Sequence, residues 1–230
     1  MAKRTWKRRL ILLALWAALA GAALLALFRY AQHWTPPREE FPVQGLSVSA
    51  LSGPVVWNMV KAQGVDFVYI RSSSGAKARD AAFATNLEGA RAAGMRYGPI
   101  HVFNLCDRAS DQATLFLSTV PRDNAMLPPV VRLSFIPKCK RRPARAAVLS
   151  ELNTFLNLIE AHMGKPALIR VSRDFDAAYN IGEGINRTLW LERNFLQPDY
   201  ASRPWVMWTA SNNHLTKGIE QPVEWDVVRP

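Results

Sequence analysis

The stretch Leu127-Pro128-Pro129-Val130-Val131-Arg132-Leu133-Ser134-Phe135 joins two prolines to a short apolar run that Pro137 closes. The run is too short for a helix and rich in β-branched residues, so it predicts a buried strand. Side chains alternate along a strand, so Arg132 and Ser134 lie on one face of it. Because an unpaired charge inside a protein is costly, Arg132 needs a partner or marks the point where the strand opens into a cleft.

Strand and helix patterns alternate on both sides of this stretch. Expected strands cover residues 43–48, 67–71, 96–103, 130–135, 166–171, 189–191, 205–209 and 223–228. Expected helices cover residues 55–63, 80–93, 110–120 and 144–163, and little helix is expected after residue 171. Repeated strand–helix units predict a parallel sheet, and the loss of later helices predicts an irregular, TIM-like (β/α) barrel. In such barrels the functional residues lie at the C-terminal ends of the strands.

The first 28 residues form a separate part of the chain. Residues 1–9 hold five basic residues and no acid, and residues 10–28 carry no charge, a length that spans a bilayer. This bias predicts a basic cytoplasmic tail, a transmembrane anchor over 10–28 and a domain outside the cytoplasm. A cleaved signal peptide ending at Ala18-Leu19-Ala20 is the alternative, but the apolar run continues for eight residues past Ala20.

Residues 29–40 are expected to form a proline-stiffened linker, and residues 41–230 a single domain. Six of the 29 lysine and arginine residues and no acid lie within residues 1–30, which lowers the formal charge from +11 for the chain to +5 for the rest. This mild excess comes without a nucleic-acid-binding motif, so nucleic acid is not expected as a partner. An anionic polymer such as the cell wall suits an exported domain better.

The chain contains two cysteines and four histidines. Cys106 and Cys139 each follow an expected strand by a few residues, and an isolated pair in an exported domain predicts a disulfide. The histidines are scattered (His33, His101, His162 and His214). Their spacing has no metal-binding signature, so neither a metal nor another cofactor is expected.

The ends of the expected strands resemble those of the glycoside hydrolase family 25 lysozymes, a family of muramidases with an irregular (β/α) barrel. Gly45-Leu46-Ser47-Val48-Ser49 is similar to the family's opening Gly-Ile-Asp-Val-Ser, and residues 127–131 are similar to Leu-Pro-Pro-Val-Leu. Further matches lie at residues 67–75, 98–103, 111–116, 189–191, 208 and 223–224. The resemblance covers residues 41–228, and the placement of the two cysteines resembles a proteobacterial branch of the family. With the anchor, this resemblance implies a single-pass protein of the bacterial inner membrane whose domain lies in the periplasm.

The resemblance ends at the catalytic positions. Family members cleave the glycan with carboxylates, chiefly an Asp-x-Glu pair on the fourth strand whose glutamate donates the proton. Here those positions are Arg132 and Ser134, and the acids of the first and second strands are Ser47 and Ser74. Only Glu224 keeps an acid at a family position. Because glycoside hydrolysis usually needs two carboxyl groups, no catalytic residue is expected.

The resemblance also identifies the side chains around the expected cleft. The expected cleft residues are Arg71, His101, Arg170, Trp208 and Glu224, beside Arg132. Together with the basic loop 138–142 they would form a basic cleft for carboxylates. The alternative is that Arg132 pairs with Glu224 and holds the barrel closed, while His101 and Trp208 are core residues.

Three functions follow from these observations. The favoured one is a membrane-anchored, catalytically degenerate lysozyme-like domain that binds peptidoglycan or an acidic envelope protein. The second is an active muramidase in which other acids, among them Asp107, Asp174 and Glu192, replace the lost ones. The third is an envelope scaffold that contacts no glycan.

Overall fold

The computed structural model describes residues 2–230 and contains two compact units, divided between Trp34 and Thr35, inside the expected linker. The first unit is a single helix, α1 (Ala2–His33). Its segment Arg9–His33 is long and apolar enough to cross a membrane. A signal sequence meets the same description, so the cleavage and the orientation of this segment stay predictions.

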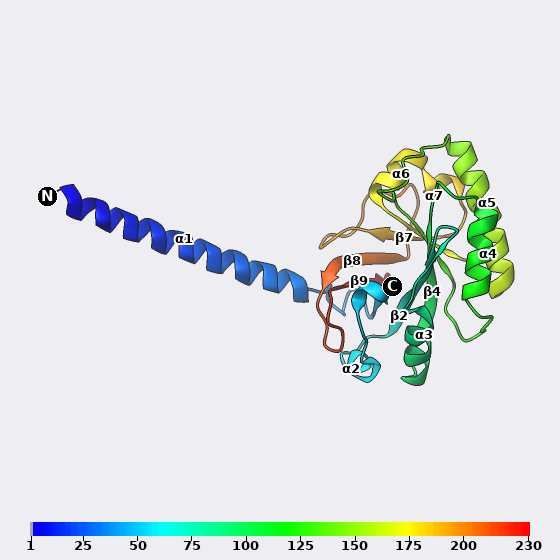
Figure 1. Cartoon of the computed structure of the whole chain (residues 1–230), viewed down its shortest axis with the longest axis horizontal. Helices are drawn as coiled ribbons and strands as arrows, with labels where there is room; N and C mark the ends of the chain where they lie inside the picture. The colour runs from blue at the N-terminus through cyan, green and yellow to red at the C-terminus, as the bar shows by residue number, and fades with distance from the viewer. Residues whose placement is uncertain (1) are drawn as a thin grey trace. The chain divides into compact units, whose positions relative to one another are not determined.

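The second unit is an α/β barrel, as the sequence predicted (Figure 1). Its strands are β1 (Val43–Val48), β2 (Phe67–Ser74), β3 (Ala78–Arg79), β4 (Arg96–Phe103), β5 (Val130–Leu133), β6 (Leu168–Val171), β7 (Thr188–Glu192), β8 (Met207–His214) and β9 (Val223–Val228). Eight of them close the barrel in the order β1-β9-β8-β7-β6-β5-β4-β2, and β2 pairs with β1. All neighbours in this ring are parallel except β9, which is antiparallel to both β8 and β1.

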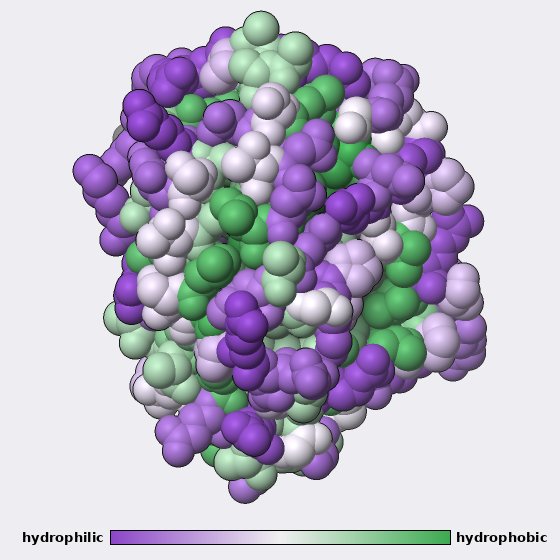
Figure 2. Space-filling model, turned by 90° about the vertical axis from the view of Figure 1, so that its right-hand side faces the viewer, coloured by the Kyte–Doolittle hydropathy of each residue, from purple (hydrophilic) through white to green (hydrophobic). Residues whose placement is uncertain are grey.

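Helices cover the barrel between its earlier strands. They are α2 (Trp57–Ala62), α3 (Phe83–Ala92), α4 (Ala109–Thr119), α5 (Arg145–Met163), α6 (Arg173–Tyr179) and α7 (Ile181–Gly184), with a short 3-10 turn, η1 (Ala50–Ser52). Within the described chain no helix follows α7, which confirms the expected loss of later helices. The face over α4 and α5 is mainly hydrophilic, with hydrophobic residues in separate patches (Figure 2).

The sequence did not predict α6 and α7, which lie between β6 and β7. Asn180 adopts the left-handed conformation, with φ of 47°, and thereby ends α6. The Asp176 carboxylate then accepts a hydrogen bond from the backbone N–H of Ile181 at 2.9 Å. The two helices are only seven and four residues long, and a buried acid stabilises the turn between them. The sequence therefore shows no apolar period long enough to predict either helix.

The barrel interior changes from apolar to polar along the strands. The apolar layer consists of Phe67, Tyr69, Ile100, Val130, Leu168, Trp190 and Met207. Side chains on the same face recur every second residue, so the next inward positions toward the strand ends are polar. They include Arg71, Arg132, Arg170 and Glu192. The polar site is therefore a direct continuation of the core.

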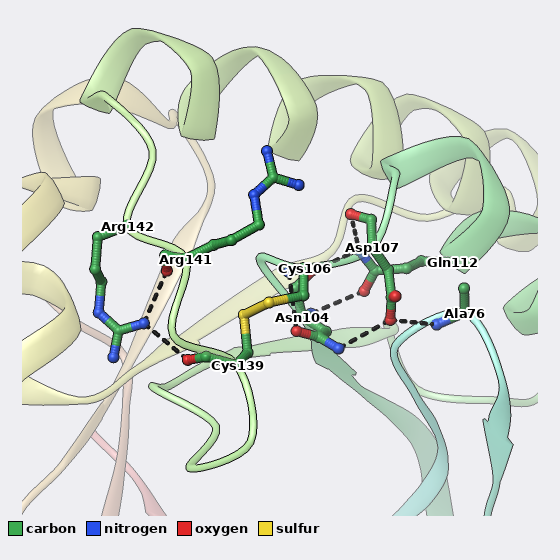
Figure 3. The surroundings of a disulfide bond; sticks show 8 residues. All are labelled: Ala76, Asn104, Cys106, Asp107, Gln112, Cys139, Arg141 and Arg142. Carbon is green, nitrogen blue, oxygen red and sulfur yellow. Dashed lines mark hydrogen bonds between the residues drawn. A yellow bond between two sulfur atoms is a disulfide. The ribbon is translucent and has the colours of Figure 1, made fainter.

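The expected disulfide is present. Cys106 in the loop after β4 is bonded to Cys139 in the loop after β5, with Cα atoms 5.8 Å apart (Figure 3). Asn104 also braces the first of these loops, because its side chain accepts from the Cys106 N–H and donates to Asp107. The two loops are thus joined at one end of the barrel.

Replacing both cysteines by serine should lower the free energy of unfolding by up to ~3–4 kcal/mol, because the bond closes a loop of intermediate length in the unfolded chain. Denaturant unfolding of the C106S/C139S variant beside the unchanged chain measures this loss. A second measurement treats the unreduced, denatured protein with an alkylating reagent. Labelling of both cysteines would contradict the disulfide.

Candidate functional site

Two arginines and two glutamates form a closed ring of ion pairs in the mouth of the barrel. Arg132 contacts Glu192 at 3.0 Å and Glu224 at 2.9 Å. Arg170 contacts the same two carboxylates, at 2.6 Å and 2.9 Å. Arg170 is completely buried and lies 4.9 Å from the ring centroid of Trp190, whereas Arg132 is 29% exposed. We call these four residues the mouth ring.

Strand register explains why these side chains meet. Arg132 of β5 and Arg170 of β6 are direct neighbours across a parallel pair. Glu192 is the last residue of β7, two positions after the neighbour of Arg170. Because β9 is antiparallel, its first residues lie at the mouth, and Glu224 is therefore opposite Ser47 near the end of β1.

A third acid, Asp226, is completely buried one layer below the mouth ring. Asp226 follows Glu224 by two positions and points the same way along β9. Its carboxylate accepts hydrogen bonds from the Ser47 hydroxyl at 2.6 Å and the Thr209 hydroxyl at 2.7 Å. The Trp190 indole N–H in turn donates to Thr209 at 2.9 Å. Asp226 was not among the predicted site residues, although the Glu-x-Asp spacing on an expected strand places it on the same face as Glu224.

The surroundings shift the pKa values of Asp226 and Glu224 in opposite directions. Burial raises the pKa of Asp226 to about 6, although the positive charge of Arg170 opposes this shift. Burial alone would also raise the pKa of Glu224, but Arg170 and Arg132 hold it below its usual value. The pKa of Arg170 is raised by its acidic neighbours, which outweigh the effect of burial. The ring side chains Arg170 and Glu224 therefore stay charged, while Asp226 titrates near neutral pH.

The raised pKa of Asp226 predicts a pH-dependent stability. Between about pH 4 and about pH 6 the folded chain keeps a proton that the unfolded chain has lost, so the free energy of unfolding falls as the pH rises. Asp226→Asn stays neutral at every pH. This variant should be more stable than the unchanged chain by roughly 1–3 kcal/mol at about pH 7.5 and equal to it near pH 4. Denaturant unfolding at both values measures the difference, and an equal gain at both would contradict the raised pKa.

Two hollows open on either side of the mouth ring. The first, of about 200 Å³, is lined by Ser47, Ser49, Ser52, Arg71, Arg132, Asn212 and Glu224, among others. The second, of about 220 Å³, shares Arg132, Asn212 and Glu224 with the first and adds Asn194 and Thr209. Hydroxyl and amide groups from β1, β8 and the loop after β7 therefore surround the ring.

The mouth is charge-balanced rather than basic, which corrects the expectation of an anion-binding cleft. The third expected arginine, Arg71, contacts Asp80 at 2.7 Å. Arg132 and Arg170 share the glutamates of the mouth ring. The pairing of Arg132 with Glu224 was the alternative interpretation of the sequence, and the structure contains that contact. The added partner, Glu192, was considered only as a replacement acid.

The structure places His101 and Trp208 outside both hollows. His101 is fully buried, lies 4.6 Å from the ring of Phe155 and bonds Ser73 at 2.9 Å. Burial lowers the pKa of His101 to about 4, so the side chain is neutral near neutral pH. Trp208 is buried, packs edge-on against Phe41 and donates to the Arg193 carbonyl at 2.6 Å. Both side chains belong to the packing around the barrel.

The remaining predicted positions lie around the mouth without joining the ring. Ser74 ends β2 opposite Ala78 of β3, and Ser134 follows β5 directly. Asp174 accepts a hydrogen bond from the Ser172 hydroxyl at the start of α6. Within the described residues no group of histidines, cysteines or acids has the arrangement of a metal site.

The family model of glycosyl hydrolases family 25 matches residues 46–219. The chain belongs to glycosyl hydrolase family 25. Uncharacterized protein YegX of Escherichia coli K12 is 27% identical over 194 residues, which cover 81% of this chain and 70% of YegX. Lysozyme M1 of Streptomyces globisporus is 32% identical over 105 residues, which cover 44% of this chain and 36% of the lysozyme.

Solved structures agree with the family 25 fold. The structure of a family 25 glycosyl hydrolase from Bacillus anthracis superposes with a TM-score of 0.77 at 24% identity, covering 86% of this chain and 92% of that one. That Arg132 and Ser134 replace the family's Asp-x-Glu pair stays a prediction from the resemblance. The mouth ring lies at the C-terminal ends of β5, β6 and β7, the end at which such barrels carry their functional residues.

Proposed function

We propose that this family 25 domain binds peptidoglycan without cleaving it, and that α1 anchors it in the membrane with the barrel in the periplasm. The mouth ring is the observation that carries this proposal. A general acid must hold a proton near the operating pH. Glu224 contacts two guanidinium groups, and their positive charges hold its pKa below the usual value, so it stays ionised. Glu192 forms ion pairs with the same two groups.

The charge of the ring also opposes the reaction itself. Glycoside hydrolysis passes through a transition state in which the sugar ring gains positive charge. Arg132 is partly exposed in the mouth and would repel that charge. The pKa of Asp226, about 6, would suit a general acid. Its carboxylate, however, is completely buried and accepts hydrogen bonds from Ser47 and Thr209. These features favour binding over hydrolysis.

The two hollows supply the groups that sugar binding needs. Serine hydroxyls line the first hollow, and the amide of Asn212 lines both. Hydroxyl and amide groups donate and accept hydrogen bonds, and so do the hydroxyls and N-acetyl groups of a glycan. Polar groups that converge in a concave site are typical of ligand binding.

The test uses the full-length protein in mild detergent with purified insoluble peptidoglycan. We expect the protein to sediment with the peptidoglycan and to release no reducing ends between about pH 4.5 and about pH 8. Asn212→Ala should weaken sedimentation because Asn212 lines both hollows, whereas Asn213→Ala, the matched control, should not. Release of reducing ends would favour an active muramidase. Failure to sediment would favour a scaffold.

The anchor makes a separate prediction. Because residues 10–28 carry no charge and follow a basic start, the full-length protein should be recovered from the inner-membrane fraction with its N-terminal segment intact. N-terminal sequencing of the purified protein is the measurement. A mature N-terminus near Gly21 would instead indicate a cleaved signal peptide.

A further inference from the structure

A larger cavity, of about 400 Å³, adjoins the disulfide. Phe103 of β4 lines this cavity, while its neighbour Val102 lines the first hollow of the mouth. Successive side chains of a strand point to opposite faces, so the cavity lies just outside the barrel wall at the mouth end of β4. We call it the rim cavity. Its volume falls within the range of pockets that hold small ligands.

The acids that line the rim cavity are already engaged. The Asp107 carboxylate accepts hydrogen bonds from the Ala76 N–H at 3.0 Å and from the Asn104 side chain at 2.9 Å (Figure 3). The Glu151 carboxylate accepts a hydrogen bond from the Ala109 N–H at 2.7 Å, at the start of α4. Both acids therefore accept hydrogen bonds from backbone amides of the surrounding loops. Their two negative charges equal the two positive charges of the lining arginines, so the inference rests on the free donors of those arginines and not on a net positive charge.

The two arginines of the lining are not engaged. Across residues 2–230, the guanidinium groups of Arg108 and Arg141 make no hydrogen bond or ion pair. Arg142 differs, because its guanidinium lies 3.9 Å from the Phe135 ring centroid and donates to the Cys139 carbonyl. Arg141 and Arg142 leave the loop in opposite directions (Figure 3). Arg142 thus packs against the protein, while the N–H donors of the exposed Arg141 guanidinium are available to a ligand.

The disulfide holds the two loops that carry these exposed arginines close together. Arg108 follows Cys106 by two residues, and Arg141 follows Cys139 by two residues. A single covalent bond therefore holds the two guanidinium-bearing loops together on one cavity. Linked loops lose less conformational freedom when a ligand contacts both of them. Leu105, Pro143 and other apolar residues line the remaining wall.

We propose that the rim cavity binds a free carboxylate of a short peptide, at a residue with a small aliphatic side chain. Arginine pairs with carboxylates through two parallel hydrogen bonds, and the apolar wall suits methyl groups beside that carboxylate. On peptidoglycan this ligand is the stem peptide, so the inference rests on the proposed function and divides the polymer between two sites. The glycan lies in the mouth and the peptide lies in the rim cavity.

The experiment measures the binding of three soluble probes to the full-length protein in detergent by calorimetry. The probes are a disaccharide–tetrapeptide, the same compound with its carboxyl groups amidated, and the disaccharide without peptide whose lactyl carboxyl group is amidated. The first probe should bind about tenfold more tightly than the other two, because the loss of a hydrogen bond to a charged group typically weakens binding by at least that factor. Arg108→Ala and Arg141→Ala should each remove about this preference. Lys140→Ala, which removes the same charge from the same loop outside the cavity, should not.

The C106S/C139S variant provides a second readout, because it keeps both arginines and should still lose much of the preference. Equal binding of the disaccharide–tetrapeptide by Arg141→Ala and the unchanged chain would overturn the inference, and so would equal binding of all three probes. If the protein sediments with peptidoglycan regardless of Arg141, only the proposed function stands. If it binds the soluble peptide through Arg141 but does not sediment, only the rim cavity stands.

Discussion

Arg170→Met is expected to lower the free energy of unfolding by about 3–5 kcal/mol, the cost of removing one partner from a buried ion pair. Arg170 is completely buried and contacts both Glu192 and Glu224. Without it, Arg132 alone would compensate two carboxylates, and Asp226 beneath them would lose its nearest cation. Methionine fills a similar volume, so the loss would reflect charge rather than an empty cavity. Denaturant unfolding monitored by tryptophan fluorescence measures it.

Two further variants separate this effect from a general loss of arginine. Arg173→Ala removes an arginine whose ion pair with Asp199 is mostly exposed, and its stability should be unchanged within error. Adding Glu224→Gln to Arg170→Met removes one uncompensated charge and should restore part of the lost stability. If Arg170→Met unfolds at the same denaturant concentration as the unchanged chain, the mouth ring does not stabilise the barrel.

Restoring hydrolysis should require four substitutions rather than one. Ser134→Glu alone should stay inactive, because the neighbouring positive charge of Arg132 would lower the pKa of the new acid. Arg132→Asp removes that charge and restores the acid pair. Ser47→Asp restores the first-strand acid, but Ser47 lies 2.6 Å from the Asp226 carboxylate, so two buried acids would share one site. Asp226→Asn removes this conflict.

The variant with all four substitutions should release reducing ends from purified peptidoglycan ~10²–10⁴-fold faster than Ser134→Glu, which is the usual contribution of a positioned acid or base. Binding to insoluble peptidoglycan, measured in parallel, controls for loss of the fold. Equal rates from Ser134→Glu and the fourfold variant would show that Arg132 does not suppress the proton donor. Activity of the unchanged chain would contradict the whole interpretation of the site.

The sequence predicted the barrel well because its strands have clear apolar patterns. The expected bounds 43–48, 96–103 and 223–228 coincide with β1, β4 and β9. The direction of β9 was not predictable in the same way, since an apolar pattern identifies a strand but not its orientation. That direction decides which end of β9 reaches the mouth, and so it decides the depth of Glu224 and Asp226.

The candidate site was predictable in part. A lone arginine within an apolar run indicated that Arg132 needed a partner, and Glu224 is one of them. To predict the second partner, Glu192, and the second arginine, Arg170, one must know which inward positions of β5, β6 and β7 lie in the same layer. That depends on strand register, which follows from barrel closure and not from any local pattern. For this reason the sequence predicted a basic cleft where the charges in fact balance.

The antiparallel placement of β9 also constrains how the barrel is completed. β1 pairs with β2 on one side and with β9 on the other, so the earliest strand gains its second neighbour only when the last strand is available. If the barrel domain emerges in chain order, β1 and β8 are unpaired sheet edges until residue 223 and its successors arrive. Exposed edges invite pairing with other chains. Until then the chain depends on protection from self-association, and any truncation that removes β9 would make that dependence permanent.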